Sequence, residues 1–213
     1  MAKKGARREE PRPAPLPRGP FRLGAVPGAT PGKWISIWNE RMPRTPLELV
    51  PLTVAGQRDA LLAGEVDAAI VRLPVDRDGL HAIPLYDEVA VVLVAADSHL
   101  TAADELEASD LAGEVLIVAS DDVLGFTADG TVAPSFAAPE TSDAVATVAA
   151  GVGVLVVPMS IARLHHRRDL DFRPLRDGPT STVALAWVAD RTTPLVDTFV
   201  GIVRGRSANS SRG

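Results

Sequence analysis

The hydrophobic positions of this chain form short apolar runs that alternate with helical patterns. Leu61–Leu73 (LLAGEVDAAIVRL) and Val145–Pro158 (VATVAAGVGVLVVP) show this most clearly. In each stretch, a helix rich in small apolar residues ends at a glycine and is followed by an apolar run of strand length. Such runs are typical of strands buried on both faces of a sheet that is covered by helices. The pattern predicts an α/β fold built from two such units.

The first part of the chain predicts a β-α-β-α-β order, and therefore a parallel sheet with right-handed crossovers. Thr30 and Thr53 stand where helix N-caps are expected, with Pro31 at the first helical position. Gly64 stands where the second helix is expected to stop. The expected elements are strands at Phe21–Val26, Leu47–Leu52 and Asp67–Leu73, and helices at 30–42 and 53–63.

The rest of the chain predicts a second α/β unit and a return to the first. A long apolar strand at Val89–Ala96 has no helix before it, which indicates a connection that leaves the first unit. Residues 121–140 contain several glycines and prolines and are interpreted as loop. The other expected elements are a short helix near 106–111, strands at 115–119, 154–157, 170–174 and 183–188, and helices at 141–150, 159–166 and 194–203.

Charge is unevenly distributed along the chain. The net charge is −5, but residues 1–20 carry +4 and residues 204–213 carry +3, so the residues between them carry −12. Because the first segment combines proline with like charges, we expect residues 1–20 to be a disordered basic tail and residues 205–213 a second one. Such tails either aid solubility or contact nucleic acid or an acidic partner. An acidic body does not wrap DNA unaided, so direct DNA binding is not expected.

Composition excludes several classes of protein. The chain has no cysteine, which rules out disulfides, thiolate metal sites and cysteine nucleophiles. Its apolar segments are far shorter than the roughly 20 residues of a membrane span, so no membrane is expected as a partner. The N-terminal Lys and Arg residues lead into a proline-rich segment instead of the apolar run of a signal peptide. We therefore expect a cytoplasmic protein.

Five segments, in this order, resemble the effector-binding domain of LysR-type transcriptional regulators. They are FRLGAVPGATPGKW, LLAGEVDAAIVRLP, IPLYDEVAVVLVAADSHL, VAAGVGVLVVP and VALAWVADRTTPLVDTFVGIVR, within about residues 21–204. The resemblance implies a type 2 periplasmic-binding-protein fold, with two Rossmann-like lobes joined by crossover strands. The first lobe is then expected at 21–86 plus 180–204 and the second at 87–179. Family members usually begin with a winged helix-turn-helix, and the basic tail before the first strand is too short for one, so we expect this chain to lack it.

Ligands of open α/β sheets bind beyond the carboxyl ends of the strands, where helices begin. Backbone N–H groups and the helix dipole at such a start favour a carboxylate, although N-capping alone also explains a threonine there. The resemblance favours a ligand-binding role after the first strand, where the family places an effector-contacting hydroxyl. The helix starts with small hydroxyl residues are Gly28-Ala29-Thr30, Thr53 and Thr141-Ser142, and we expect Gly28, Ala29, Thr30 and Thr53 to bind the ligand.

Arg72 ends an otherwise apolar strand, just before Pro74. A buried guanidinium needs a partner, and its fork matches a carboxylate. Two interpretations stay open: Arg72 binds a carboxylate effector, or it forms an internal ion pair, for example with Asp67 or Asp76. The resemblance supports the first, since the family often has an effector-contacting polar or basic group here.

The second lobe is expected to contribute Ser120, at the end of its strand, and Gly153-Val154 to the ligand site. The acidic pair Asp121 and Asp122 lies in a turn-like stretch, and turn formation explains it. No metal site is expected, because adjacent helical residues such as His165 and His166 point about 100° apart. No nucleophile elbow surrounds any serine, so we expect no catalytic residue, no cofactor and no enzymatic activity.

The sequence thus predicts a two-lobed protein that binds a small effector, expected to be a carboxylate, between its lobes. It would regulate transcription through a partner, either a second copy of itself or a full-length regulator. The alternative from the sequence is an interaction module or remnant regulator whose cleft is filled by its own side chains. Such a module would act through its basic tails or through dimerisation.

Overall fold

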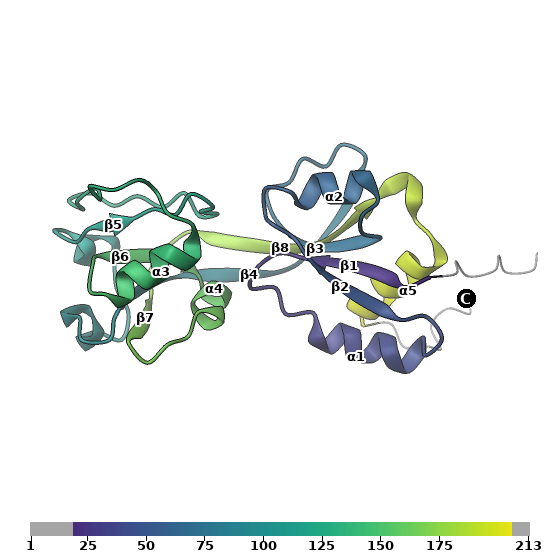
Figure 1. The fold of residues 1–213 in the computed structure, drawn as a ribbon, viewed down its shortest axis with the longest axis horizontal. Helices are drawn as coiled ribbons and strands as arrows, with labels where there is room; N and C mark the ends of the chain where they lie inside the picture. The colour runs from purple at the N-terminus through teal and green to yellow at the C-terminus, as the bar shows by residue number, and fades with distance from the viewer. Residues whose placement is uncertain (1–18, 206–213) are drawn as a thin grey trace, which may run out of the picture.

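The computed structural model describes residues 19–205, which form two lobes joined by two long strands (Figure 1). The α/β fold with two lobes, expected from the sequence, is confirmed. The predicted tails fall almost wholly on residues 1–18 and 206–213 and so lie outside the described residues. Within 19–205, every helix is too short or too polar to cross a bilayer.

One path of paired strands runs through both lobes in the order β2-β1-β3-β8-β4-β6-β5, with β7 paired to β4. Lobe 1 comprises β1 (Phe21–Ala25), α1 (Gly32–Arg41), β2 (Leu47–Pro51), α2 (Gln57–Ala63), β3 (Ala68–Arg72), a 3₁₀ turn (Ala189–Arg191) and α5 (Pro194–Val203). Lobe 2 comprises two 3₁₀ turns (His99–Ala102 and Ala108–Leu111), β5 (Leu116–Ile117), α3 (Thr141–Ala149), β6 (Val154–Pro158), α4 (Met159–Leu164) and β7 (Leu170–Pro174). The strands β4 (Leu80–Ala95) and β8 (Thr180–Val188) connect the lobes. The lobe boundaries expected from the sequence stay a prediction, because the paired strands pass between the lobes without a break.

Lobe 1 is a sheet covered by helices on both faces. β1 pairs in parallel with β2 and β3, and β3 pairs antiparallel with β8. On one face, Trp38 of α1 and Phe199 of α5 pack against Phe21 of β1, with ring centroids 4.6 and 5.3 Å from that of Phe21. α2 covers the other face. The parallel arrangement brings the carboxyl ends of β1, β2 and β3 to one edge of the lobe.

Lobe 2 is built around the second half of β4, whose last residues, Ala90–Ala95, are all buried. This half pairs antiparallel with β6 and β7, and β5 extends the sheet in parallel with β6. α3 and α4 cover one face, and the two 3₁₀ turns cover the other. The register pairs Pro158 with Ala90, so the carboxyl end of β6 lies toward lobe 1 and its amino end lies away from it.

The long strand β4 starts at Leu80, whereas the sequence predicted a start at Val89. Only the second half is apolar throughout, and the first half is largely exposed or half-buried, so the hydrophobic run marks only the part inside lobe 2. The first half also contains Pro84, which has no N–H to donate to a sheet. The pairing with β8 shifts register between Pro84 and Tyr86, and such irregularities tolerate proline.

The predicted capping threonines do not cap helices. α1 begins at Gly32, with Pro31 at the N-cap position and no side-chain cap. The Thr53 hydroxyl accepts a hydrogen bond from the Gly56 N–H (3.0 Å) in the turn before α2. The stop of α2 at Gly64, which is in the left-handed conformation (φ +73°), is confirmed.

Candidate ligand-binding site between the lobes

A cavity of about 280 Å³ lies between the two lobes. Its lobe 1 wall is formed by Pro27, Val54 and Arg72, which follow or end β1, β2 and β3. Its lobe 2 wall comes from the segment after β5, the start of α3, the end of β6 and α4. The volume lies near the lower end of the range of small-molecule sites, about 300–1,000 Å³. The cavity can therefore hold one small molecule in contact with both lobes.

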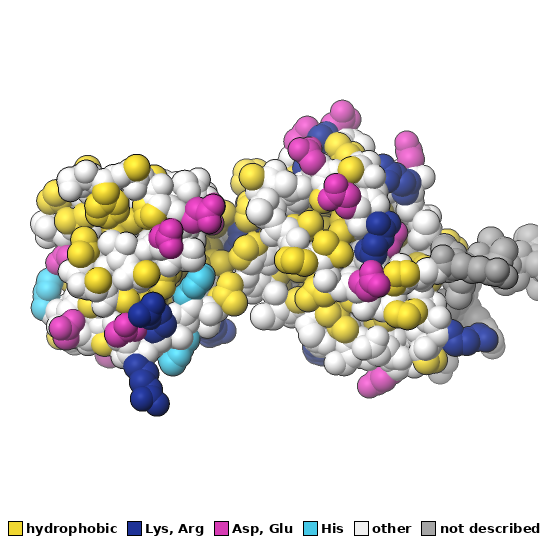
Figure 2. All heavy atoms as spheres, viewed as in Figure 1, with side chains coloured by type: hydrophobic (Ala, Val, Ile, Leu, Met, Phe, Trp, Pro, Cys, Tyr) yellow, Lys and Arg dark blue, Asp and Glu magenta, His cyan; other side chains and the backbone are white. Residues whose placement is uncertain are grey.

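Most of the cavity wall is apolar. Leu155, Val157 and Pro158 of β6 and Ile161 and Leu164 of α4 line it from lobe 2. Figure 2 shows apolar side chains on both lobes around their junction. Such a wall favours a ligand with a sizeable apolar part.

Arg72 forms a buried ion pair beside the cavity. Its side chain is 2% exposed and its Nη1 donates to Oε2 of Glu88 (2.9 Å), whose side chain is 9% exposed. The same Nη1 donates to the Ser181 hydroxyl (2.7 Å). An internal ion pair was one of the two interpretations from the sequence, but the partner is neither Asp67 nor Asp76. The charge of the guanidinium is thus compensated within the protein.

The second nitrogen of Arg72 reaches lobe 2. Its Nη2 donates to the Ser160 hydroxyl on α4 (3.2 Å) and to the backbone oxygen of Pro27 (3.3 Å). Ser160 in turn donates to Oε2 of Glu88 (2.8 Å). Ser160 therefore joins α4 to the buried ion pair, so a movement of α4 relative to lobe 1 must break or reshape these hydrogen bonds.

The polar part of the lobe 2 wall is acidic. Asp121, Asp122 and Glu140 all line the cavity. Oδ1 of Asp121 accepts hydrogen bonds from the backbone N–H of Thr141 (2.8 Å) and from its hydroxyl (2.7 Å). The positive end of α3 is thus already occupied by a carboxylate of the protein.

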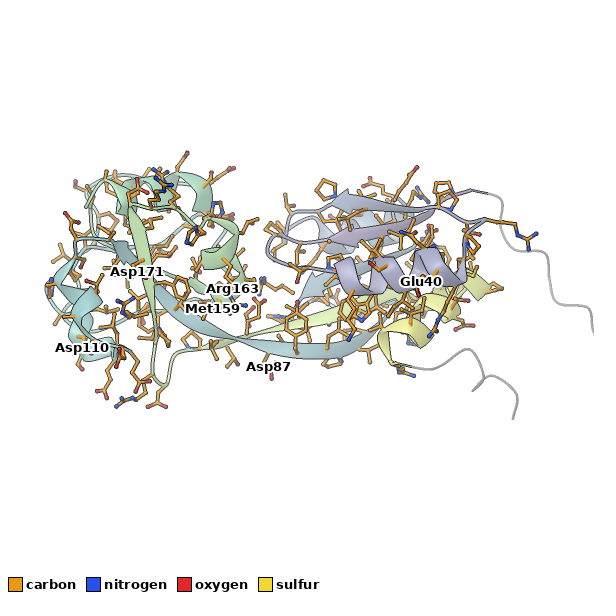
Figure 3. All side chains as sticks on the ribbon, turned by 90° about the horizontal axis from the view of Figure 1, so that it is seen from below. Glu40, Asp87, Asp110, Met159, Arg163 and Asp171 are labelled. Atoms are coloured by element: carbon orange, nitrogen blue, oxygen red, sulfur yellow. The ribbon has the colours of Figure 1, made fainter. Side chains whose placement is uncertain are left out.

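A second cavity, of about 520 Å³, lies between the same lobes beside α4. Gly28, Ala29 and Thr30 line it from lobe 1, and Tyr86–Val89 of β4 line it at the connection. In Figure 3, Met159 and Arg163 lie on α4 facing this gap, and Asp87 lies on β4 between the lobes. Burial raises the pKa of Tyr86 above its usual value, and Glu88 raises it further while Arg72 lowers it. The Tyr86 hydroxyl is therefore a neutral donor at neutral pH.

A family model of the LysR substrate binding domain matches residues 14–208 of this chain. The chain belongs to the LysR substrate-binding domain family. Two relatives are the Hca operon transcriptional activator HcaR of Escherichia coli, 27% identical over 88% of this chain, and the regulator CatR of Pseudomonas putida, 30% identical over 74%. The chain spans 68% of the length of HcaR and 57% of that of CatR.

Solved structures agree with this assignment. A mutant regulatory domain of OxyR from Pseudomonas aeruginosa is 28% identical and superimposes with a TM-score of 0.65, over 89% of this chain and 98% of that one. The effector-binding domain of BenM with its effector benzoate superimposes with a TM-score of 0.71 over 88% of this chain and 91% of that one. At 20% identity, BenM shows the shared fold alone. The type 2 periplasmic-binding-protein-like fold expected from the sequence is thereby confirmed.

Of the residues expected from the sequence to bind the ligand, some line a cavity of this LysR substrate-binding domain and others do not. Arg72 lines the first cavity, and Gly28, Ala29 and Thr30 line the second. Thr53 and Ser120 do not line either cavity, but Val54 and the two neighbours of Ser120 line the first.

Gly153 and Val154 lie away from both cavities. They stand at the amino end of β6, whereas the carboxyl end of this strand faces the cleft. Val154 is 1% exposed within the core of lobe 2. A side chain on Gly153 would collide with the backbone of Val115, so this glycine is required for close packing. Their glycine-rich pattern reflects that packing.

The acidic residues of the cleft are functional candidates that the sequence interpretation missed. Turn formation explained Asp121 and Asp122 from the sequence, and both do accept backbone hydrogen bonds. Their position in the sequence could have identified them, because these residues follow the carboxyl end of the predicted strand at 115–119, and ligands of α/β sheets bind at such ends. Among residues 19–205, no cluster of His, Asp and Glu side chains is arranged to hold a metal ion.

Proposed function

We propose that this LysR substrate-binding domain senses a small molecule in the 280 Å³ cavity and passes the signal to transcription through a partner. The supporting observation is that one cavity is walled by three strand ends of lobe 1 and by α3 and α4 of lobe 2. The lobes can adopt more than one arrangement, and a ligand that contacts both lobes stabilises the arrangement it binds more tightly. The size of this effect is the difference in the ligand's affinity between the arrangements. That difference is the signal a partner can detect.

The relatives support the regulatory role, since HcaR and CatR are transcriptional regulators. The role is binding and not catalysis, in the cytoplasm, where transcription of such bacterial operons takes place. The proposed partner is a second copy of this chain or a full-length regulator. The sequence suggested an anionic effector held by Arg72, but the engagement of Arg72 with Glu88 removes the reason for that expectation. The proposed function therefore does not depend on an anionic effector.

The alternative from the sequence, a module with a filled cleft, has less support. It requires that side chains close the space between the lobes, whereas a cavity of about 280 Å³ is present there.

A metabolite screen by thermal shift, with a matched pair of variants, tests the proposed function. A ligand at 100 times its Kd adds about 2.7 kcal/mol to the free energy of unfolding, which raises Tm measurably. Ser142→Trp places a large ring at the exposed start of α3 that lines the cavity, whereas Ala146→Trp places it on an exposed part of α3 outside the lining. We expect stabilising compounds to lose their effect with Ser142→Trp and keep it with Ala146→Trp. Equal shifts in both variants, or no stabilising compound at all, would contradict the proposal.

A further inference from the structure

The charges around the interlobe cavity point to the chemical class of its ligand. Three carboxylates, Asp121, Asp122 and Glu140, line it from lobe 2. The cationic side chains in its wall are Arg72 and, when protonated, His165. Asp121 and Glu140 are exposed and Asp122 is half-buried, so together they give the lobe 2 side of the cavity a negative potential, which attracts ligands of the opposite sign.

Arg72 does not balance these carboxylates, because Glu88 neutralises it. A ligand carboxylate could pair with the guanidinium only by displacing Glu88. The Glu88 side chain is only 9% exposed and also accepts a hydrogen bond from Ser160. The displaced Glu88 would then be a buried charge without a partner, which is strongly unfavourable.

The start of α3 offers no seat for a ligand carboxylate either. The Thr141 N–H already donates to Asp121, and Glu140 stands at the N-cap position beside it. A second anion placed there would face two carboxylates at close range. Of the features that favoured a carboxylate in the sequence, Arg72 and the start of α3 are therefore both occupied by groups of the protein.

We propose that the effector of this cavity is a small, largely apolar molecule that carries a protonated amino group and not a carboxylate. The apolar part would pack against Leu155, Val157 and Ile161, and the ammonium would lie near the carboxylates of lobe 2. The inference rests on the proposed function, since it names the class of molecule that the same cavity binds.

Matched triplets of compounds test this inference. Each triplet shares one apolar skeleton and differs in the head group, as in benzylamine, benzyl alcohol and benzoate. Thermal shift identifies the binding skeletons, and calorimetry measures Kd with the wild-type chain. We expect the amine to bind at least tenfold more tightly than the carboxylate, which corresponds to about 1.4 kcal/mol. A carboxylate that binds as tightly as its amine, or more tightly, overturns the inference while the proposed function stands.

Charge-neutral variants locate the source of the preference. In Asp122→Asn/Glu140→Gln, two cavity carboxylates lose their charge, and the new amide oxygen at position 122 still accepts the hydrogen bond of the Leu124 N–H, while that of the Gly125 N–H is lost. Asp97→Asn/Asp104→Asn is the matched control, because it removes two exposed carboxylates of lobe 2 outside the cavity lining. We expect the preference for the amine to fall below about threefold in the first variant and to stay unchanged in the second.

Two results of these measurements would contradict different claims, one the inference and the other the proposed function. If both variants retain the preference for the amine, the cavity carboxylates are not its cause and the inference is wrong. If no member of any triplet binds to the wild-type chain, the proposed function itself fails.

Discussion

Arg72 holds four groups from separate parts of the chain at once. They are Glu88 on β4, Ser181 on β8, Ser160 on α4 and the backbone oxygen of Pro27. Its own backbone N–H donates to the side-chain oxygen of Gln57 (2.8 Å), which anchors the end of β3 to α2. One side chain thus fixes the point at which both lobes and both connecting strands meet.

The loss of Arg72 is expected to destabilise the fold strongly. Arg72→Met leaves Glu88 as a buried carboxylate without its cation, and breaking such a pair costs about 3–5 kcal/mol. Urea denaturation measures the change in the free energy of unfolding. Arg58→Met is the comparison, since the Arg58–Asp76 pair is far more exposed, at 28% and 66%, and is expected to contribute less than about 1 kcal/mol. A similar decrease in the free energy of unfolding in the two variants would show that the buried pair contributes no more to stability than the exposed one.

Tyr86 gives a direct measure of the electrostatics between the lobes, because it is the single tyrosine of the chain. Burial, and after it Glu88, raises its pKa above the ordinary value of 10.0. The neutral form is thus favoured in the folded state, so the contribution of Tyr86 to stability is complete below about pH 10 and is lost as the pH rises through its folded pKa.

We expect the tyrosinate absorbance of the folded protein to titrate with a midpoint above 10.0, and that of the denatured protein near 10. Glu88→Gln should lower the folded midpoint without bringing it back to the denatured value, since burial is the larger cause. A folded midpoint at or below the denatured one would contradict the partial burial of Tyr86, which is 38% exposed.

At the scale of elements, helix starts determine the chemistry of the cleft. The threonine at the start of α3 does not cap the helix through its own side chain. Instead, Asp121, twenty positions earlier, supplies the carboxylate that accepts its N–H. Local sequence rules expect the cap within the helix start itself, so Thr141-Ser142 suggested a free anion site at α3, where Asp121 leaves none.

Removal of this cap from α3 is expected to cost about 1 kcal/mol. Asp121→Ala leaves the N–H and the hydroxyl of Thr141 without their acceptor, and the loss of a cap costs between about 0.5 and 2 kcal/mol. Asp129→Ala, a change in the same loop, should have little effect. Urea denaturation of the two variants compares them, and an equal loss would show that Asp121 does not cap α3.

Elements could be predicted from the sequence where burial leaves a pattern. β7 and α5 are found at the residues expected, and β3 and β6 agree within one residue at each end. The first half of β4 and the partners of Arg72 could not be predicted in this way. The former is largely exposed or half-buried, and the latter come together only through the crossing of β4, β8 and α4. The cleft position of Arg72 was predictable because a guanidinium at the end of a buried strand needs a partner, but the partner's identity is a tertiary property.

At the scale of the whole molecule, the two lobes are linked by β4 and β8 and by the hydrogen bonds of Ser160. Lobes that are joined by two strands can rotate about a hinge more readily than lobes that pack over a large interface. A ligand that binds in the cavity can therefore change the arrangement of the lobes through this hinge.

A change in the distance between the lobes is expected on ligand binding. Because the chain has no cysteine, Asp59→Cys on α2 and Ala146→Cys on α3 introduce the only two sites for spin labels. We expect a stabilising compound to narrow or shift the distribution of distances between the labels, measured by pulsed electron resonance. Two labels within lobe 1, at Asp59→Cys and Glu40→Cys, should give the same distribution with and without the compound.

The structure of the protein bound to the most stabilising compound of the screen tests the central claim most directly. We predict that the compound lies in the 280 Å³ cavity, in contact with Val54 of lobe 1 and with the start of α3 in lobe 2. A compound bound to one lobe alone, with this cavity empty, would contradict the account.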